Sequence, residues 1–372
     1  MAAGTPTGKR ARYIGAGFVF GTILNDRVYL DHAATTPLHP AAAAAMAQGQ
    51  ALWANPSSPH AEGRAARRAL EDARVRIAAA LGWHGHVVLT AGASEALALA
   101  LRGRRVAAGA TEHDAVWRSS PEARVLAVDR QSLINPAAIT VEPDERMVVQ
   151  SVNSETGVRQ PLAAIAPLVR AAGGVLVVDA SQSAGKLPLP DADLIVVSGH
   201  KLGGPVGIGA LLVRDLALLE PSGGQEFGYR AGTENLPAAL GLAAALEQPR
   251  AWLEAAARWR CIVEAAVLDN SGEVIPPDAP RADHILSLRM PGVPAAAQLI
   301  RFDLAGIAVS AGSACASGSL KPSRVLAAMG IEPAAAAETI RVSTGWSTTD
   351  AEVERFVATW REIARDVARQ AA

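Results

Sequence analysis

Two apolar runs with the composition of buried β-strands are each followed by a charged residue. Asp179 comes directly after residues 175–178, and Lys201 follows residues 194–197 within the sequence SGHK, ahead of a glycine-rich turn. Because the strands of one sheet end at a common edge, we expect the two side chains to lie close together. Such a pair supplies the two anchors that pyridoxal phosphate requires, for its ring nitrogen and its aldehyde. Taken singly, Asp179 also fits a helix cap or ion pair, and Lys201 a surface position.

A glycine turn that opens a helix follows a third apolar run, at residues 87–89. The turn has the sequence TAGASE over residues 90–95, and the backbone N–H groups at such a helix start suit a phosphate. The simpler alternative is that a serine or threonine of the turn only caps the helix. The turn therefore indicates a phosphate site only in combination with Asp179 and Lys201.

The chain has two cysteines, too few for a disulfide framework and typical of a reducing compartment. Cys315 lies among alanine, glycine and serine over residues 310–319, a composition that predicts a mobile loop carrying a reactive thiol. Cys261 lies in an amphipathic helical pattern over residues 259–268 and is predicted to be a small buried hydrophobe. Cys315 is thus the candidate nucleophile.

The elements that must position these residues alternate along the chain. Short β-rich runs at 87–89, 125–128, 147–152, 175–178, 194–197 and 210–213 alternate with helical patterns at 62–81, 94–101 and 161–172. This alternation predicts an α/β fold, a mostly parallel sheet covered by helices on both faces. The 372 residues allow two domains. Beyond a boundary near residue 255, further helices and strands at 284–289, 307–309 and 339–343 predict a smaller α+β domain.

Composition excludes several classes of function. Half of the residues are hydrophobic and the formal net charge is −1, which argues against nucleic-acid binding and against a polybasic membrane surface. The apolar run at 14–24 is too short to span a bilayer, so we expect residues 1–27 to be a disordered extension and the protein to be cytoplasmic. The eight histidines show no metal-ligand spacing, and no metal is expected.

Ordered motifs along the chain resemble those of one known family. They are LDHAATTP (30–37), NPSS (55–58) with His60, TEH (111–113), VDASQ (178–182), SGHK (198–201), RAGTEN (230–235), GSACAS (312–317) and IRVS (340–343). In this order they resemble the cysteine desulfurases of the class V aminotransferase family, from about residue 28 to residue 360. The resemblance implies fold type I of the pyridoxal-phosphate-dependent transferases. It also implies a large cofactor-binding domain at 28–255, whose first 13 or so residues pack on the small domain, and a small domain at 256–372 with the cysteine loop.

The resemblance also implies roles for individual residues. Lys201 would hold the cofactor as a Schiff base, Asp179 would pair with its ring nitrogen, His113 would stack on the ring and Gln182 would bond its phenolate oxygen. Arg341 would grip the substrate carboxylate. The phosphate would be held by Ala93, Ser94, Ser198 and His200, and by Thr233 of a second subunit in a homodimer.

The implied reaction removes sulfur from L-cysteine. Lys201 takes the α-proton, and Cys315 attacks the substrate sulfur with His113 as proton donor or acceptor, which gives L-alanine and a Cys315 persulfide. A protein or small-thiol acceptor then takes the sulfur, for iron–sulfur cluster assembly or thiolation. Ser154 departs from the family pattern, which has an asparagine there in contact with the cofactor and substrate. The competing interpretations are a selenocysteine lyase or another class V enzyme, and an inactive binding or regulatory relative.

Overall fold

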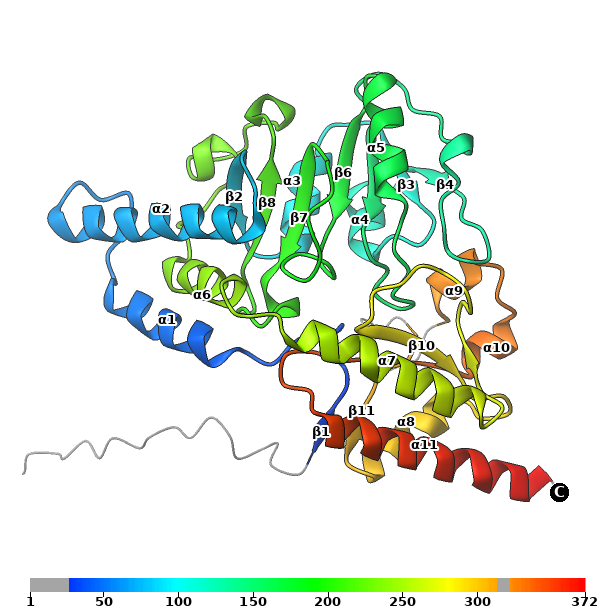
Figure 1. Ribbon diagram of the computed structural model, residues 1–372. Coiled ribbons are helices and arrows are strands. Elements are labelled where there is room, and N and C mark those ends of the chain that lie inside the picture. Colours follow the sequence, from blue (N-terminus) through cyan, green and yellow to red (C-terminus); the bar gives the residue numbers. More distant parts are fainter. Residues whose placement is uncertain (1–26, 313–321, 372) are drawn as a thin grey trace, which may run out of the picture.

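The computed structural model describes residues 27–312 and 322–371. Its main sheet has seven strands in the spatial order β2-β8-β7-β6-β5-β3-β4 (Figure 1). They span β2 (His86–Thr90), β3 (Val106–Gly109), β4 (Arg124–Leu126), β5 (Arg146–Gln150), β6 (Val175–Asp179), β7 (Leu194–Ser198) and β8 (Gly209–Val213). The five strands from β7 to β4 are parallel, and β8 lies antiparallel between β7 and β2. The predicted mostly parallel sheet is confirmed, with β3 as an additional strand.

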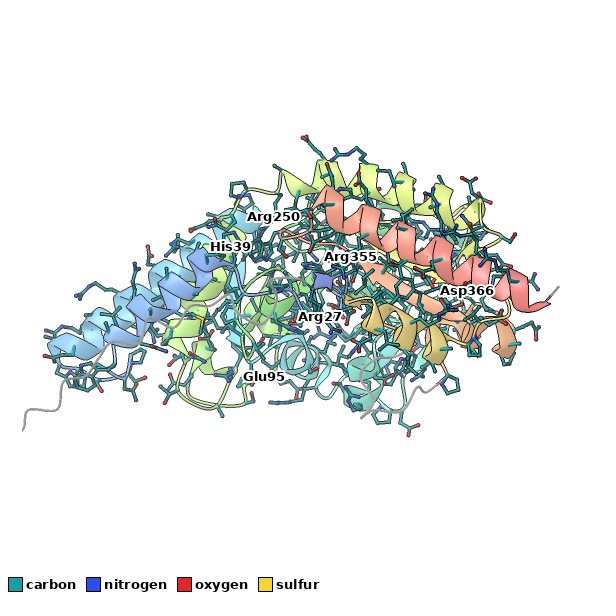
Figure 2. All side chains as sticks on the ribbon, turned by 90° about the horizontal axis from the view of Figure 1, so that it is seen from below. Arg27, His39, Glu95, Arg250, Arg355 and Asp366 are labelled. Carbon is teal, nitrogen blue, oxygen red and sulfur yellow. The ribbon has the colours of Figure 1, made fainter. Side chains whose placement is uncertain are left out.

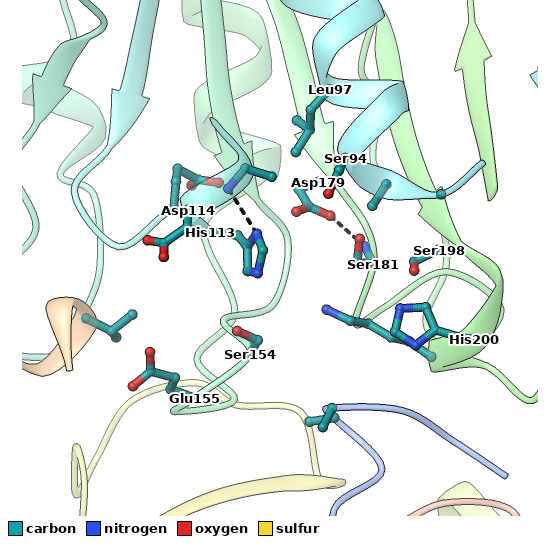
Figure 3. A pocket seen from close by; sticks show the side chains of 18 of the residues that line it. Ser94, Leu97, His113, Asp114, Ser154, Glu155, Asp179, Ser181, Ser198 and His200 are labelled. Carbon is teal, nitrogen blue, oxygen red and sulfur yellow. Dashed lines mark hydrogen bonds between the residues drawn. The ribbon is translucent and has the colours of Figure 1, made fainter. Parts of the chain in front are cut away.

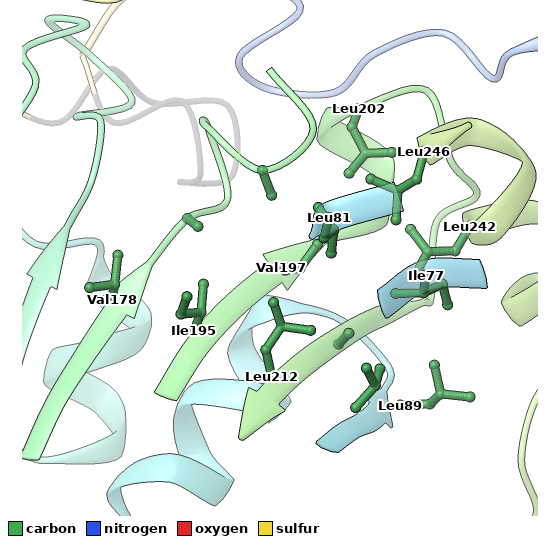
Figure 4. Close-up of a cluster of buried hydrophobic side chains, with 14 of the residues drawn as sticks. Ile77, Leu81, Leu89, Val178, Ile195, Val197, Leu202, Leu212, Leu242 and Leu246 are labelled. Carbon is green, nitrogen blue, oxygen red and sulfur yellow. The ribbon is translucent and has the colours of Figure 1, made fainter. Parts of the chain in front are cut away.

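Helices cover both faces of this sheet, because alternate residues of each buried strand point to opposite sides. One face packs against α1 (Pro40–Ala51), α2 (Ala61–Leu81), α5 (Leu162–Ala171) and α6 (Leu236–Leu246), and the other against α3 (Ala93–Leu101) and α4 (Asp114–Ser119). In β6, for example, Val178 belongs to the first hydrophobic cluster and Val177 to the second. Figure 4 shows Val178, Ile195, Val197 and Leu212 on the α6 face. Both faces are therefore apolar, and polar residues occur at the strand ends.

The C-terminal part has two small sheets. Strands β9 (Glu273–Val274), β10 (Ile285–Arg289) and β12 (Thr339–Ser343) form an antiparallel sheet with β10 in the middle, and β1 (Val28–Tyr29) pairs in parallel with β11 (Ile307–Ala308). The surrounding helices are α7 (Trp252–Leu268), α8 (Ala295–Leu304), α9 (Arg324–Ala328), α10 (Pro333–Ala337) and α11 (Asp350–Ala371). Figure 2 looks onto α11, along which Arg355 and Asp366 lie.

A separate hydrophobic cluster holds these C-terminal elements together. Phe302 of α8 stacks on Phe356 of α11, with ring centroids 5.1 Å apart, and Trp360 lies beside both. Val28 and Leu30, from the beginning of the described chain, belong to the same cluster. The division of the chain at residue 255 stays a prediction, since α7 begins at Trp252 and continues across it.

Cys261 corrects one expectation from the sequence. The predicted buried cysteine is exposed on α7. The buried face of this helix is formed by Ala256, Trp259, Val263 and Val267. Cys261 lies two residues from both Trp259 and Val263, about 200° around the helix, which turns it to the opposite side.

Within the described ranges, no helix combines the length and the apolar character needed to cross a membrane. The short 3₁₀ turns η1 (Pro136–Ala138), η2 (Gly199–Lys201), η3 (Leu216–Leu218) and η4 (Glu226–Gly228) complete the architecture.

Candidate active site

A cavity of about 690 Å³ opens at the carboxyl ends of the parallel strands, where C-terminal elements close over the sheet edge. Ligands of α/β sheets bind at this edge. Figure 3 shows side chains from several strands and loops pointing into it. The predicted site residues that line the cavity are Ala93, Ser94, His113, Ser154, Asp179, Ser198, His200, Lys201 and Arg341. The fold thus brings together residues that are far apart in the sequence.

Asp179 is the last residue of β6 and is 8% exposed. Its Oδ1 accepts a hydrogen bond of 2.9 Å from the backbone N–H of Ser181 (Figure 3). Its backbone carbonyl accepts from Ser151 N at the end of the neighbouring strand. The carboxylate is therefore held in a fixed orientation at the wall of the cavity, where a cationic group would compensate for its burial.

Lys201 follows β7 in the η2 turn, which packs tightly on the chain before β8. A side chain at Gly199 would lie 2.8 Å from the carbonyl oxygen of Ile208, so only glycine fits there. The hydroxyl of Thr36 donates to the Lys201 carbonyl at 3.2 Å and anchors the turn from the other side. The turn that carries the lysine is thus held on two sides, by Ile208 at Gly199 and by Thr36 at Lys201.

His113 is the N-cap residue of α4, and its Nδ1 accepts a 3.1 Å hydrogen bond from the backbone N–H of Ala115 (Figure 3). This contact fixes the neutral tautomer with the proton on Nε2. Burial, followed by the Lys201 charge, lowers the pKa of His113. The same two causes lower the pKa of His200 to about 4. Both histidines are neutral near pH 7.

The start of α3 forms a cradle for an anion. Gly92 precedes the helix with φ +145°, and no side chain in the described part of the chain caps the N-terminal N–H groups. Ser94, Ser198 and His200 line the cavity at this position. Beneath the turn, a side chain at Gly209 of β8 would lie 2.8 Å from the Gly92 Cα, so the backbones approach closely. Uncapped N–H groups with two hydroxyls suit a phosphate.

Arg341 reaches the cavity from β12 and is 7% exposed. Its Nη2 donates to Asp31 Oδ1 at 2.7 Å and its Nη1 to the Ser154 carbonyl at 3.0 Å. Burial raises the pKa of Asp31, and the Arg341 charge opposes that shift. Asp31, which the sequence did not single out, therefore orients the guanidinium.

Two of the predicted residues do not line the cavity, and a third lies outside the described residues. Gln182 lies behind Ser181, where its Nε2 donates to the Ala33 carbonyl at 2.8 Å. Thr233 is exposed beside a separate hollow that Trp53 also lines. Cys315 falls outside the described residues, and Gly312, three positions before it, lines the cavity.

The sequence analysis missed two glutamates that line the cavity. Glu112 Oε1 accepts from the Gln150 N–H at 2.8 Å, and burial raises its pKa well above the usual value. Glu155 accepts a 2.6 Å bond from the Ser323 hydroxyl, and burial raises its pKa as well. Glu112 directly precedes the predicted site residue His113, and this position was the signal by which the sequence could have identified it. Among the described residues, no cluster of histidine, cysteine, aspartate and glutamate could hold a metal.

The family model for class-V aminotransferases matches residues 28–356. The chain belongs to the class-V aminotransferase family. An IscS-like cysteine desulfurase of Mycobacterium tuberculosis is 35% identical over 366 residues, covering 88% of this chain and 93% of that protein. The resemblance drawn from the motifs is therefore confirmed.

Solved structures of similar proteins agree with the fold. A NifS-like protein from Rickettsia africae superimposes with a TM-score of 0.83 at 26% identity, over 91% of this chain and 99% of that one. The structure of SspA in complex with cysteine gives a TM-score of 0.74 at 31% identity, over 85% of this chain and 98% of that one. Fold type I is thus the architecture of this member of the class-V aminotransferase family.

Proposed function

We propose that this chain is a pyridoxal-phosphate-dependent cysteine desulfurase, which releases L-alanine from L-cysteine and keeps the sulfur as a persulfide on Cys315. The observation that carries the proposal is the placement of Lys201 and Asp179 at neighbouring strand ends in one cavity with Arg341. The relatives named cysteine desulfurase support the choice of substrate.

The cavity has features that fit pyridoxal phosphate. Its volume of about 690 Å³ lies within the range of ligand pockets. The uncapped start of α3, with Ser94, Ser198 and His200, offers donors to the phosphate. Asp179 offers a fixed carboxylate to the ring nitrogen and Lys201 an amine to the aldehyde.

The bound cofactor supplies an electron sink for the substrate α-carbon. Arg341 holds the substrate carboxylate with its planar guanidinium. The Lys201 amine removes the α-proton, and the neutral His113 is placed to donate or accept a proton at the substrate sulfur. The Cys315 thiolate attacks that sulfur, a sulfur–sulfur bond forms, and the carbon–sulfur bond breaks with its electrons left on the carbon chain. Protonation of that chain gives alanine.

Two subunits complete the site in this proposal. Thr233 is exposed, and the large apolar side chains of Trp53 and Val206 are 79% and 78% exposed. Val206 lines the mouth of the cavity, and Trp53 lines the hollow next to Thr233. Exposed apolar side chains of this size are typical of protein interfaces. A homodimer would cover them and bring Thr233 to the phosphate of the other subunit. The sulfur acceptor is a protein or a small thiol, and the enzyme acts in the cytoplasm.

The deciding experiment measures sulfide and alanine released from L-cysteine in the presence of a reductant. The wild-type protein, reconstituted with pyridoxal phosphate, is compared with Cys315→Ala and with Cys261→Ala, in which the exposed cysteine of α7 is removed. We expect equimolar products from the wild type and from Cys261→Ala, and none from Cys315→Ala. Equal product from Cys315→Ala would identify a lyase that needs no thiol, and no product from the wild type would refute the assignment.

A further inference from the structure

A second, much smaller cavity lies behind Lys201. Its volume is about 10 Å³, close to the space that one water molecule needs. Lys201 lines this rear cavity as well as the active-site cavity. The lysine therefore separates the two, with the substrate side in front and a water-sized space behind.

Two residues that line this rear cavity, Thr344 and Trp252, each have a buried polar atom. The Thr344 hydroxyl and the Trp252 indole N–H have no hydrogen-bond partner among the described residues. Buried hydroxyl and indole groups are nearly always hydrogen-bonded, to protein or to ordered water. A water molecule in this space would satisfy both groups. The rear cavity, which Lys201 also lines, thus has the size and the polar neighbours of a water site.

Lys186 is a second lysine in the wall of the rear cavity. Its Nζ lies 3.5 Å from His284 Nε2, the nitrogen that also contacts the Gln182 carbonyl at 3.1 Å. Burial, followed by the charges of Lys201 and Arg250, lowers the pKa of Lys186 to about 7. Lys186 can therefore exchange a proton near neutral pH.

The other titratable groups that face Lys186 are basic. Arg250, labelled in Figure 2, lines the rear cavity, and its Nε donates to the Gly185 carbonyl at 2.6 Å. Burial lowers the pKa of His284 well below the usual value and that of His32 to about 3, and the Lys186 charge contributes in both cases. Both histidines thus stay neutral near pH 7 and leave the proton to the two lysines.

We propose that Lys186 and one water molecule in the rear cavity share a proton with the Lys201 amine during the reaction. This inference rests on the proposed function. When Lys201 takes the proton from the substrate α-carbon, one N–H of its ammonium passes a proton to the water, and the water passes another to the neutral Lys186. The proton returns by the same route when the carbon chain is protonated. Lys186 acts through Lys201 as a positioning residue for the proton.

The test titrates the visible absorbance of the bound cofactor, which reports protonation of the Lys201 nitrogen, against pH in the holoenzyme. The variants are Lys186→Met, which removes the second amine, and Thr344→Val, which removes the hydroxyl from the rear cavity. The control is Arg170→Met, which removes an exposed cation paired with Asp191. We expect Lys186→Met to raise the apparent pKa of the Lys201 nitrogen by about one unit, because Lys186, whose pKa is about 7, is partly protonated near neutral pH and the variant loses that positive charge. Arg170→Met should leave it unchanged.

Thr344→Val keeps both amines and tests the water. We expect its absorbance titration to match the wild type, and its kcat to fall about tenfold with KM unchanged, the size of a general acid–base contribution. A Lys186→Met holoenzyme that titrates like the wild type would overturn the inference. A wild-type kcat in Thr344→Val would also overturn it, and this second measurement decides the matter if Lys186→Met does not fold. A wild-type protein that takes up no cofactor would refute the proposed function and this inference together.

Discussion

Lys201 and Asp179 lie at neighbouring strand ends, and each can be tested by one substitution. Lys201→Ala removes the only proposed covalent attachment for the cofactor, so borohydride reduction should no longer fix cofactor to the protein, and alanine production should fall by about 10³-fold or more. Asp179→Asn keeps the shape of the side chain and loses its charge. In this variant borohydride should still attach the cofactor covalently to the protein, while alanine production falls by about 10²-fold. Covalent trapping in Lys201→Ala would contradict the assignment.

Arg341 is expected to act on binding more than on rate. In Arg341→Lys the charge stays, but the two-pronged contact with a carboxylate is lost, so KM for L-cysteine should rise about 10- to 100-fold with a smaller change in kcat. Asp31→Asn leaves the guanidinium in place but weakens its 2.7 Å bond from Nη2 to Asp31, and should raise KM less. Steady-state kinetics of the two variants measures the difference. An unchanged KM in Arg341→Lys would remove Arg341 from substrate binding.

The site residues that the sequence identified are those that follow a segment recognisable as a buried strand. Lys201 and Asp179 follow runs of branched apolar residues that identify a buried strand without further information. Glu112 follows β3, whose sequence VAAG has one branched residue and does not stand out as a strand. Asp31 follows β1, which is two residues long and pairs with β11, far away in the chain. Their place in the site depends on long-range pairing that no local pattern encodes.

At the scale of elements, a buried ion pair holds the η4 turn against α2 and β2. Arg74 donates to both oxygens of Glu226, at 2.7 and 3.1 Å, and Glu226 also accepts from the Leu89 N–H at 2.7 Å. The side chains are 9% and 0% exposed. Neither residue drew notice in the sequence, because nothing local relates an arginine to a glutamate so distant in the chain.

Glu226→Gln should therefore destabilise the protein, since it leaves the buried Arg74 charge with only the partly exposed Glu71 as its counter-charge. We expect the free energy of unfolding to fall by about 3–5 kcal/mol, measured by urea denaturation. The double variant Arg74→Met with Glu226→Gln removes both charges and should recover part of this loss. The exposed pair Arg170–Asp191 is the matched comparison, and Asp191→Asn should cost at most about 1 kcal/mol. Equal losses at the two pairs would contradict this account.

At the scale of the whole molecule, buried histidines make the stability depend on pH. Burial lowers the pKa of His284 well below the usual value near 6.5, so below about pH 6.5 the unfolded chain binds a proton that the native state does not. Stability from this residue is thus present above pH 6.5 and lost as the pH falls, by about 1.4 kcal/mol per pH unit. In His284→Gln, the unfolding free energy should therefore fall less steeply between about pH 6.5 and 4.5, with a slope lower than that of the wild type by about 1.4 kcal/mol per pH unit. Parallel curves would show that His284 is protonated in the native state.

The proposed dimer predicts that two inactive subunits can restore one active site. If Thr233 binds the phosphate in the partner's site, Thr233→Ala damages the site of the partner subunit. The site of the Thr233→Ala subunit itself is complete whenever its partner has an intact Thr233. In a heterodimer with Lys201→Ala, the site of the Thr233→Ala subunit has its own Lys201 and an intact Thr233 from the other chain. Its partner site lacks both groups.

Mixing the two variants in equal amounts and allowing subunits to exchange should therefore restore activity to about one quarter of the wild-type value, because half of the dimers are mixed and each has one complete site. The separate variants should each remain well below this level. Trp53→Glu, which adds a charge to the exposed apolar surface beside Thr233, should abolish recovery by preventing association, with a monomer mass in light scattering. If Thr233 instead served its own subunit, the mixture would have no restored site and would show only the mean of the two variant activities.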